Sequence, residues 1–239
     1  MKKKMRKFKI YRYDPEKDSK PYYREYSVET HEGMTLLDAI IHISENMDPS
    51  LSVRYSCRMS VCGSCGMSVN DSLKLACKTQ LETLHGDVLK IEPLPSMKVI
   101  KDLVVDMEPF LDNLKKVKPY LITHTPDPAK ERLQSVYDRE LIDSSVDCIL
   151  CGCCTTSCPV FWTDKGYLGP AAITKAFRFL YDSRDEGYED RLHVLGGVGG
   201  VDKCHHAYRC VEACPKNINT TYAIDMVKKL ILTGKRDTE

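Results

Sequence analysis

The sequence lacks a large net charge and any long apolar run. Its 35 Lys and Arg residues nearly balance 34 Asp and Glu residues, which leaves a formal net charge of +1. A chain so close to neutral has none of the basic excess typical of nucleic-acid binding, and we expect no nucleic-acid partner. Its apolar runs are far shorter than the roughly 20 residues of a membrane-spanning helix. We therefore expect any membrane association to depend on a partner.

An apolar secretory leader is also missing from the start of the chain. The first residues, MKKKMRKFKIYRYD, pass from lysines directly into alternating polar positions. This pattern predicts a reducing compartment, in which disulfide bonds are rare. The even number of cysteines, twelve, therefore does not indicate a disulfide framework. Repeats of solenoid length and low-complexity tracts are absent as well.

What the chain does have is cysteine in three tight groups. The groups are Cys57, Cys62, Cys65 and Cys77; then Cys148, Cys151, Cys153, Cys154 and Cys158; then Cys204, Cys210 and Cys214. Cysteine thiolates bind iron, and spacings of this kind are typical of iron-sulfur cluster loops. The chain is therefore interpreted as an electron carrier.

Residues 1–105 are predicted to form a β-rich domain. Thr35 is placed to cap a helix whose apolar residues would pack on a sheet. Asn70 and Asp71 mark a turn between two strands. The expected strands are residues 8–14, 22–29, 66–71, 72–78 and 88–95. Two strands followed by a helix are the opening of a β-grasp fold, so this half is predicted to be a ferredoxin-like domain.

Residues 106–239 change to helical periodicity. The expected helices are residues 109–122, 169–185 and 219–234. The middle one is clearest, because Pro170 suits a first helical turn and Ile173, Phe177 and Leu180 share one face. Gly196 to Asp202 are expected to form a loop. The predicted fold class is α+β: a β-grasp domain followed by an all-α domain resembling a two-cluster bacterial ferredoxin.

The first cysteine group has the plant-type [2Fe-2S] spacing. Cys57, Cys62 and Cys65 give C-x4-C-x2-C, and Cys77 follows after eleven residues. Such a loop wraps around two irons and directs backbone N–H groups at sulfur, which favours small residues such as Gly63. The alternative is structural zinc, but zinc modules usually pair two C-x2-C knuckles. This group is therefore predicted to bind [2Fe-2S].

The second and third groups are predicted to share two clusters. Cys148, Cys151, Cys154 and Cys158 followed by Pro159 form C-x2-C-x2-C-x3-C-P, in which the fourth cysteine serves the other cluster of a pair. A [4Fe-4S] cluster would then be held by Cys148, Cys151, Cys154 and Cys214.

Three thiolates remain for the other cluster: Cys158, Cys204 and Cys210. Ala207 stands where a full run would place another cysteine. Three ligands suit a [3Fe-4S] cluster, although an open-cornered [4Fe-4S] site that binds substrate is the alternative. Cys153 is left over and is interpreted as a small buried side chain.

The ordered motifs of the chain resemble those of one family. They are CRMSVCGSCG, LACKT, IEPLP, VIKDLVVDM, CILCGCCTTSCP, FRFLYDSRD and CHHAYRCVEACPKNIN, spread over residues 7–232. The chain resembles the iron-sulfur subunit of succinate dehydrogenase, the succinate:quinone oxidoreductase of respiratory complex II, and of fumarate reductases. The resemblance implies an enzyme subunit with [2Fe-2S], [4Fe-4S] and [3Fe-4S] clusters and no catalytic residue of its own.

The resemblance also implies partners and a place in the cell. They are a flavoprotein subunit carrying FAD, where succinate or fumarate reacts, and membrane anchor subunits beside which quinone binds. The expected location is peripheral, on the cytoplasmic face of a prokaryotic inner membrane, or on the mitochondrial matrix side as a processed chain. A different dehydrogenase subunit, a soluble ferredoxin and a zinc-binding interaction module are the alternatives.

By the same resemblance, a quinone site would involve Pro159, Trp162, Thr163 and His205. Many ubiquinone-using members carry serine in place of Val160 and a second tryptophan in place of Thr163. For His205 a buried, hydrogen-bonded role is the alternative, and for His206 it is the favoured interpretation. Ser60 is a further departure, because relatives often have glycine there, and a positive φ at that position would strain it.

Overall fold

The structure is a computed structural model that describes residues 4–236. The chain divides into two compact units, each of which is described by itself. The first contains the residues up to Met107 together with Ile149–Thr156, and the second contains Glu108–Cys148 and the residues from Ser157 onward. The grouping of Ile149–Thr156 with the first unit was not anticipated from the sequence.

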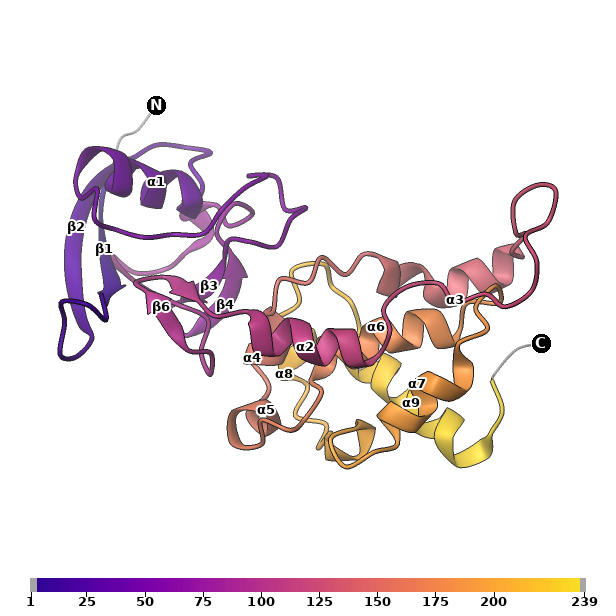
Figure 1. Cartoon of the computed structure of the whole chain (residues 1–239). Coiled ribbons are helices and arrows are strands. Elements are labelled where there is room, and N and C mark those ends of the chain that lie inside the picture. Colours follow the sequence, from indigo (N-terminus) through magenta and orange to yellow (C-terminus); the bar gives the residue numbers. More distant parts are fainter. Residues whose placement is uncertain (1–3, 237–239) are drawn as a thin grey trace. The chain divides into compact units, whose positions relative to one another are not determined.

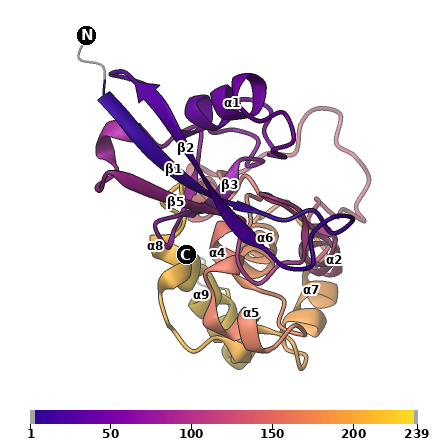
Figure 2. The same cartoon turned by 90° about the vertical axis from the view of Figure 1, so that its left-hand side faces the viewer.

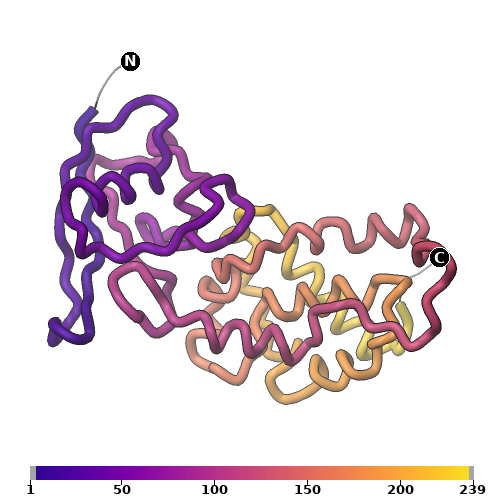
Figure 3. The backbone as a smooth tube through the Cα atoms, turned by 45° about the horizontal axis from the view of Figure 1, so that its top comes forward, coloured from indigo at the N-terminus to yellow at the C-terminus, as the bar shows by residue number. Residues whose placement is uncertain are grey.

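The first unit contains a five-stranded mixed sheet (Figure 1). Its strand order is β2-β1-β5-β3-β4, and β1 pairs with β2 antiparallel and with β5 parallel. The strands are β1 Lys4–Arg12, β2 Tyr22–Thr30, β3 Gly66–Val69, β4 Ser72–Leu75 and β5 Val88–Glu92. A separate small hairpin joins β6 Val99–Lys101 and β7 Val104–Val105, and η1 Leu81–Thr83 is a short 3-10 turn. The long β1–β2 hairpin is the indigo arm of the tube in Figure 3.

Helix α1, Leu36–Asn46, packs across one face of this sheet (Figure 2). Thr35 begins the helix with a capping box, because its hydroxyl accepts from Asp38 N and the Asp38 carboxylate accepts from Thr35 N. The apolar face of α1 and the inward side chains of the strands form one core, in which Phe8, Ile10 and Ile40 are fully buried. The predicted β-grasp arrangement is confirmed, including the turn at Asn70 and Asp71, whose φ angles of 47° and 62° suit a tight hairpin.

A buried ion-pair network holds the C-terminal end of β1, at Arg12, in place. Arg12 Nη1 donates to Asp48 Oδ2 at 2.5 Å and Arg12 Nε donates to Asp102 Oδ1 at 2.9 Å. The phenol of Tyr26 also donates to Asp48 Oδ2, and Arg12 Nη2 reaches Ser50 Oγ. Each charge is therefore paired and hydrogen-bonded, as burial requires. This network ties β1, the end of α1 and the β6–β7 turn together.

The second unit is helical. Its elements are α2 Glu108–Lys116, α3 Val136–Val146, α5 Pro159–Thr163, α6 Pro170–Leu180, α7 Tyr188–Leu195, η2 Val201–Lys203, α8 Arg209–Glu212 and α9 Thr220–Thr233, while α4 Cys153–Thr156 belongs to the first unit. Helix α6 is central, since it packs against α2, α3, α7 and α9. Asn219 caps the start of α9, and Gly234 ends it in the left-handed conformation.

This unit differs from the sequence prediction in two details. The helix expected over residues 109–122 ends at Lys116, because Lys118 has a φ of 48° and precedes Pro119, which disfavours helical backbone. Helix α3 was not predicted, although Ser135 caps it by accepting from Asp138 N. The predicted helix starting at Pro170 is confirmed, although it ends at Leu180. The predicted loop after Leu195 is confirmed up to Gly200, after which η2 begins.

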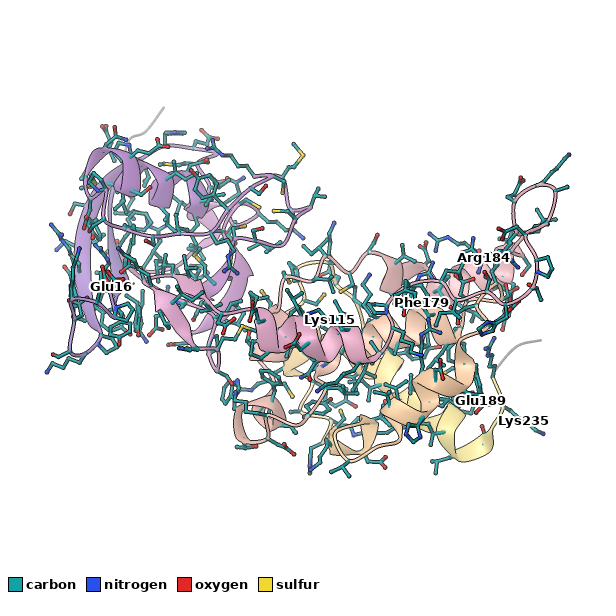
Figure 4. The ribbon with its side chains drawn as sticks, viewed as in Figure 1. Glu16, Lys115, Phe179, Arg184, Glu189 and Lys235 are labelled. Atoms are coloured by element: carbon teal, nitrogen blue, oxygen red, sulfur yellow. The ribbon has the colours of Figure 1, made fainter. Side chains whose placement is uncertain are left out.

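Buried ion pairs also hold loops of the second unit in place. Arg191 and Asp185 have fully buried side chains, and Arg191 Nη1 lies 2.5 Å from Asp185 Oδ1. Asp182 is equally buried and pairs with Arg178 and Arg184, the second of which is labelled in Figure 4. Asp182, Arg184 and Asp185 lie between the two helices, whereas Arg178 belongs to α6 and Arg191 to α7. Their pairing therefore fixes the path from α6 into α7.

Candidate iron-sulfur sites

The loop between α1 and β3 directs backbone N–H groups at cysteine sulfur. Met59, Val61 and Cys62 donate their N–H groups to Cys57 Sγ at 3.4, 3.3 and 3.2 Å. The other three sulfurs also receive backbone donors: Ser60 N lies 3.2 Å from Cys77 Sγ, Cys57 N lies 3.5 Å from Cys62 Sγ, and Cys77 N lies 3.5 Å from Cys65 Sγ. Every sulfur of the first group therefore has an N–H donor, an arrangement that suits anionic sulfur.

Left-handed backbone produces this convergence. Arg58, Ser60 and Gly63 have φ angles of 57°, 60° and 72°. Such residues reverse the chain direction, so successive N–H groups point inward rather than along a helix or strand. The positive φ considered for Ser60 from the sequence is confirmed, and a residue with a Cβ atom is strained there by about 1–2 kcal/mol.

Two of these thiols, Cys62 and Cys65, have pKa values shifted in opposite directions. Hydrogen bonds from the Ser64 side chain and the Cys57 backbone lower the pKa of Cys62 to about 6, which favours its thiolate at neutral pH. Burial raises the pKa of Cys65 to about 12. Cys65 would therefore release a proton only on binding a metal, which compensates the buried charge.

The second cysteine run lies against this loop within the first unit. A Cβ atom on Gly63 would come 2.6 Å from the carbonyl oxygen of Ile149 and 2.9 Å from Cys151 Cα. A Cβ atom on Gly66 would lie 3.3 Å from Cys153 Sγ. Glycine is needed at position 63 because both the positive φ and the close approach exclude a side chain.

The remaining cysteines of the second run are distributed over both units. Cys153 is fully buried and Cys154 is 8% exposed, and both belong to the first unit. Cys148 and Cys158 belong to the second unit, as does Cys214 of the third group. The buried position of Cys153 agrees with the interpretation drawn from the sequence.

Three cysteines of the second unit line one pocket. Cys158 precedes α5, Cys204 follows η2 and Cys210 lies in α8, and all three border the same hollow as Ala207. Burial raises the pKa of Cys158, with the N–H groups of Phe161 and Val160 acting in the opposite direction. Three soft sulfur donors around one hollow fit an iron-sulfur group.

The residues expected beside a quinone are only partly brought together. Pro159 and His205 line the pocket of the three cysteines, whereas Trp162 and Thr163 do not. Trp162 is 44% exposed on α5, and the Thr163 hydroxyl donates back to the carbonyl oxygen of Val160 at 3.2 Å. The ring of Trp162 is therefore accessible within this unit.

The two histidines are not buried. His205 is exposed, and the side chain of His206 is 38% exposed with its Nε2 2.6 Å from Asp225 Oδ1. The buried role favoured for His206, and held as the alternative for His205, was wrong, because both side chains lie at the surface of the unit. Hydrogen bonding of His206 was expected, but its partner on α9 was not identified from the sequence.

Two other kinds of feature are absent from residues 4–236. No helix there is long and apolar enough to cross a bilayer. No set of three or more His, Cys, Asp or Glu side chains in the same range closes around a single metal ion. None of the twelve cysteines, all within that range, forms a disulfide bond.

Comparisons with known proteins agree with this arrangement. Residues 7–112 match the family described as 2Fe-2S iron-sulfur cluster binding domain, and residues 144–218 match the 4Fe-4S dicluster domain. A chain of the Mycobacterium smegmatis Sdh1 complex in the apo form is 25% identical, with a TM-score of 0.85 over 97% of this chain and 97% of that chain. A hypothetical protein from Helicobacter pylori, 17% identical, shares the fold with a TM-score of 0.59 over 98% of this chain and 41% of its own. This chain therefore has the two cluster-binding domains and the fold of a succinate dehydrogenase iron-sulfur subunit, which confirms the resemblance that its motifs indicated.

Proposed function

We propose that this chain is the electron-transfer subunit of a succinate dehydrogenase or fumarate reductase. It would pass single electrons between the FAD of a flavoprotein subunit and a membrane quinone. The observation that carries the proposal is the pair of cysteine sites, one with an N–H donor for every sulfur and one with three thiols around a single pocket. Similarity to a chain of the Sdh1 complex supports the same assignment.

The proposed ligand sets follow the cysteine spacing. They are Cys57, Cys62, Cys65 and Cys77 for [2Fe-2S]; Cys148, Cys151, Cys154 and Cys214 for [4Fe-4S]; and Cys158, Cys204 and Cys210 for [3Fe-4S]. Bound clusters would supply one-electron steps, which link a two-electron flavin to a quinone. The chain itself binds the clusters, donates hydrogen bonds to sulfur and excludes water from the buried thiols. Its own residues perform no acid-base chemistry.

The partners of the proposal are a flavoprotein subunit and one or more membrane anchor subunits. With them the chain would lie at the cytoplasmic face of a prokaryotic inner membrane. Pro159, Trp162, Thr163 and His205 are proposed for the quinone end. In support, Pro159 and His205 line the pocket of the three thiols, and Trp162 is exposed on α5, the helix that Pro159 begins.

Purification of the native assembly from membranes tests the proposal. We expect a brown complex in which this chain co-purifies with a flavoprotein, and a [3Fe-4S] paramagnetic signal in the oxidised state. The variant Cys204→Ser should lose that signal while the reduced [2Fe-2S] signal persists. A colourless chain with stoichiometric zinc, or oxidised protein without the three-iron signal, would overturn the proposal.

A further inference from the structure

One face of α9 contacts the segment Cys204–Cys210 at three points. Thr221 Oγ1 lies 3.6 Å from Cys210 Sγ, Asp225 Oδ1 lies 2.6 Å from His206 Nε2, and Lys228 Nζ donates to the carbonyl oxygen of Cys204 at 3.1 Å. The spacing i, i+4, i+7 places Thr221, Asp225 and Lys228 in one row along the helix, and we call them the α9 row. The row thus follows the segment from its last cysteine to its first.

From these contacts we propose that the α9 row positions this segment, and that two of its members, Thr221 and Lys228, raise the reduction potential of the three-thiolate centre. The inference rests on the proposed function, because it concerns the cluster assigned there to Cys158, Cys204 and Cys210. Thr221 is the central member, since it contacts a ligand sulfur itself. Asp225 and Lys228 act through the backbone and side chains of the segment, as positioning residues.

The chemistry of Thr221 fixes the direction of its hydrogen bond. A cysteine that ligates iron is a thiolate and has no proton to give, so the hydroxyl of Thr221 must be the donor to Cys210 Sγ. Thr221 is 2% exposed, and water therefore does not compete for this contact. A donor to sulfur stabilises the reduced centre, which carries one more electron, more than the oxidised one. One electron is gained and later passed on, and Thr221 keeps its proton throughout.

Lys228 acts in the same direction through its charge. Its ammonium group donates to the backbone carbonyl of Cys204, whose own sulfur is one of the three proposed ligands. The Lys228 side chain is partly buried. A positive charge at this distance favours the more negative, reduced state of the centre. Helix α9 is itself held by packing on α6, so both donors are fixed on a rigid element.

Potentiometric titration of the [3Fe-4S] signal in the intact, membrane-extracted complex tests the inference. Thr221→Val removes the hydroxyl at nearly constant volume, and we expect about a tenfold less favourable reduction, equivalent to a midpoint about 59 mV lower for one electron. Thr221→Ser keeps a hydroxyl and should restore most of the wild-type value. Lys228→Met should lower the midpoint as well. Lys229→Met is the matched control, because Lys229 is exposed and adjacent on the same helix.

Each outcome decides the matter. Unchanged midpoints in Thr221→Val and Lys228→Met, with full signal intensity, would overturn the inference. Loss of the cluster in Thr221→Val alone, with retention in Thr221→Ser, would support a hydroxyl that positions Cys210. Loss in both would overturn it, since the shape of the side chain rather than its hydroxyl would then be needed. Absence of the signal in the wild-type complex would instead refute the proposed three-thiolate assignment.

Discussion

Gly63 lies directly against the backbone of Cys151: a Cβ atom added to Gly63 would come within 2.9 Å of Cys151 Cα. The two residues belong to different cysteine groups, 88 positions apart in the sequence. This contact brings the loop of the first group and the second cysteine run together within one unit. The contact leaves no room for a side chain at position 63.

Gly63→Ala should destabilise the protein through both strain and overlap. The φ of Gly63 is 72°, which costs a residue with a Cβ atom about 1–2 kcal/mol, and the overlap with Ile149 and Cys151 should add about 1–3 kcal/mol. Thermal unfolding followed by the visible absorbance of the clusters measures the loss. Gly33→Ala is the control, because Gly33 has a φ of 77° but an added Cβ would meet nothing within 4 Å. Equal losses in the two variants would show that the overlap is relieved at no cost.

Ser60→Gly, in contrast to Gly63→Ala, is expected to stabilise the protein. The φ of Ser60 is 60°, and glycine adopts this conformation without a steric penalty. The gain should be at most about 1 kcal/mol, because glycine also loses more backbone entropy on folding. Ser60 N would still donate to Cys77 Sγ, so the reduced [2Fe-2S] spectrum should not change. Denaturant unfolding of the variant and of the wild type gives the comparison, and a clear loss of stability would contradict the strain argument.

Much of the first unit could be predicted from the sequence because its signals are local. Thr35 with Asp38 is a complete capping box, and Asn70 and Asp71 tolerate the left-handed backbone of a tight turn. The four cysteines of the first loop lie close together in sequence, so their spacing alone indicates a common site. The structure adds the N–H donors, which depend on the backbone conformation of Arg58 and Ser60.

The contacts of α9 could not be predicted in the same way. Thr221, Asp225 and Lys228 are polar residues at helical spacing, a pattern that solvent-exposed faces also show. Only the position of the segment Cys204–Cys210 against α9 gives them partners. The contact between Gly63 and Cys151 was missed for the same reason, because nothing local in either motif indicates which backbone will approach it.

Ala207→Cys should alter the three-thiolate site. Ala207 lines the pocket with Cys158, Cys204 and Cys210, so a thiol there would offer a fourth ligand. We expect a fourth iron to be admitted, the oxidised three-iron signal to disappear and the potential of the centre to fall, because an added thiolate favours the oxidised state. Electron paramagnetic resonance and iron analysis check this result. Ala207→Ser, which adds a hydroxyl instead of a thiol, should keep the signal. An unchanged signal in Ala207→Cys would contradict the ligand assignment.

The network around Arg12 should make stability depend on acidity. Burial raises the pKa of Asp48, but hydrogen bonds from Ser50, Tyr26 and Arg12 outweigh it and hold the pKa below its ordinary value. The carboxylate therefore contributes stability that is fully present above its unfolded pKa of about 4 and is lost as pH falls through the folded value. Wild-type stability should thus decline below about pH 5.

The variant Asp48→Asn measures how much the ionised Asp48 carboxylate contributes to the free energy of unfolding. At pH 7 it removes one partner of a buried pair and should cost about 3 kcal/mol, because Arg12 then keeps only Asp102 as a charged partner. The difference from wild type should begin to narrow below about pH 4, because the unfolded chain then binds a proton at Asp48 that the folded protein, with its lowered pKa, does not bind. Urea unfolding between pH 8 and 3 measures both. Asp87→Asn breaks the exposed pair with Lys4 and should cost less than about 1 kcal/mol. A pH-independent difference for Asp48→Asn would rule out titration of this carboxylate as the cause.

Cys153→Ala separates the one unassigned cysteine from the ligands. Cys153 is fully buried beside Gly66, so removing its sulfur should leave a small cavity and cost about 1 kcal/mol without changing the iron or acid-labile sulfide content. Cys154→Ala, a change of the same size in the next residue, should instead lose the [4Fe-4S] cluster. Iron and sulfide analysis with spectra of the reduced protein distinguishes them. The reverse result, with iron lost from Cys153→Ala and retained in Cys154→Ala, would exchange the roles of the two neighbours, because adjacent residues of α4 point in different directions and only one of them can face a given iron.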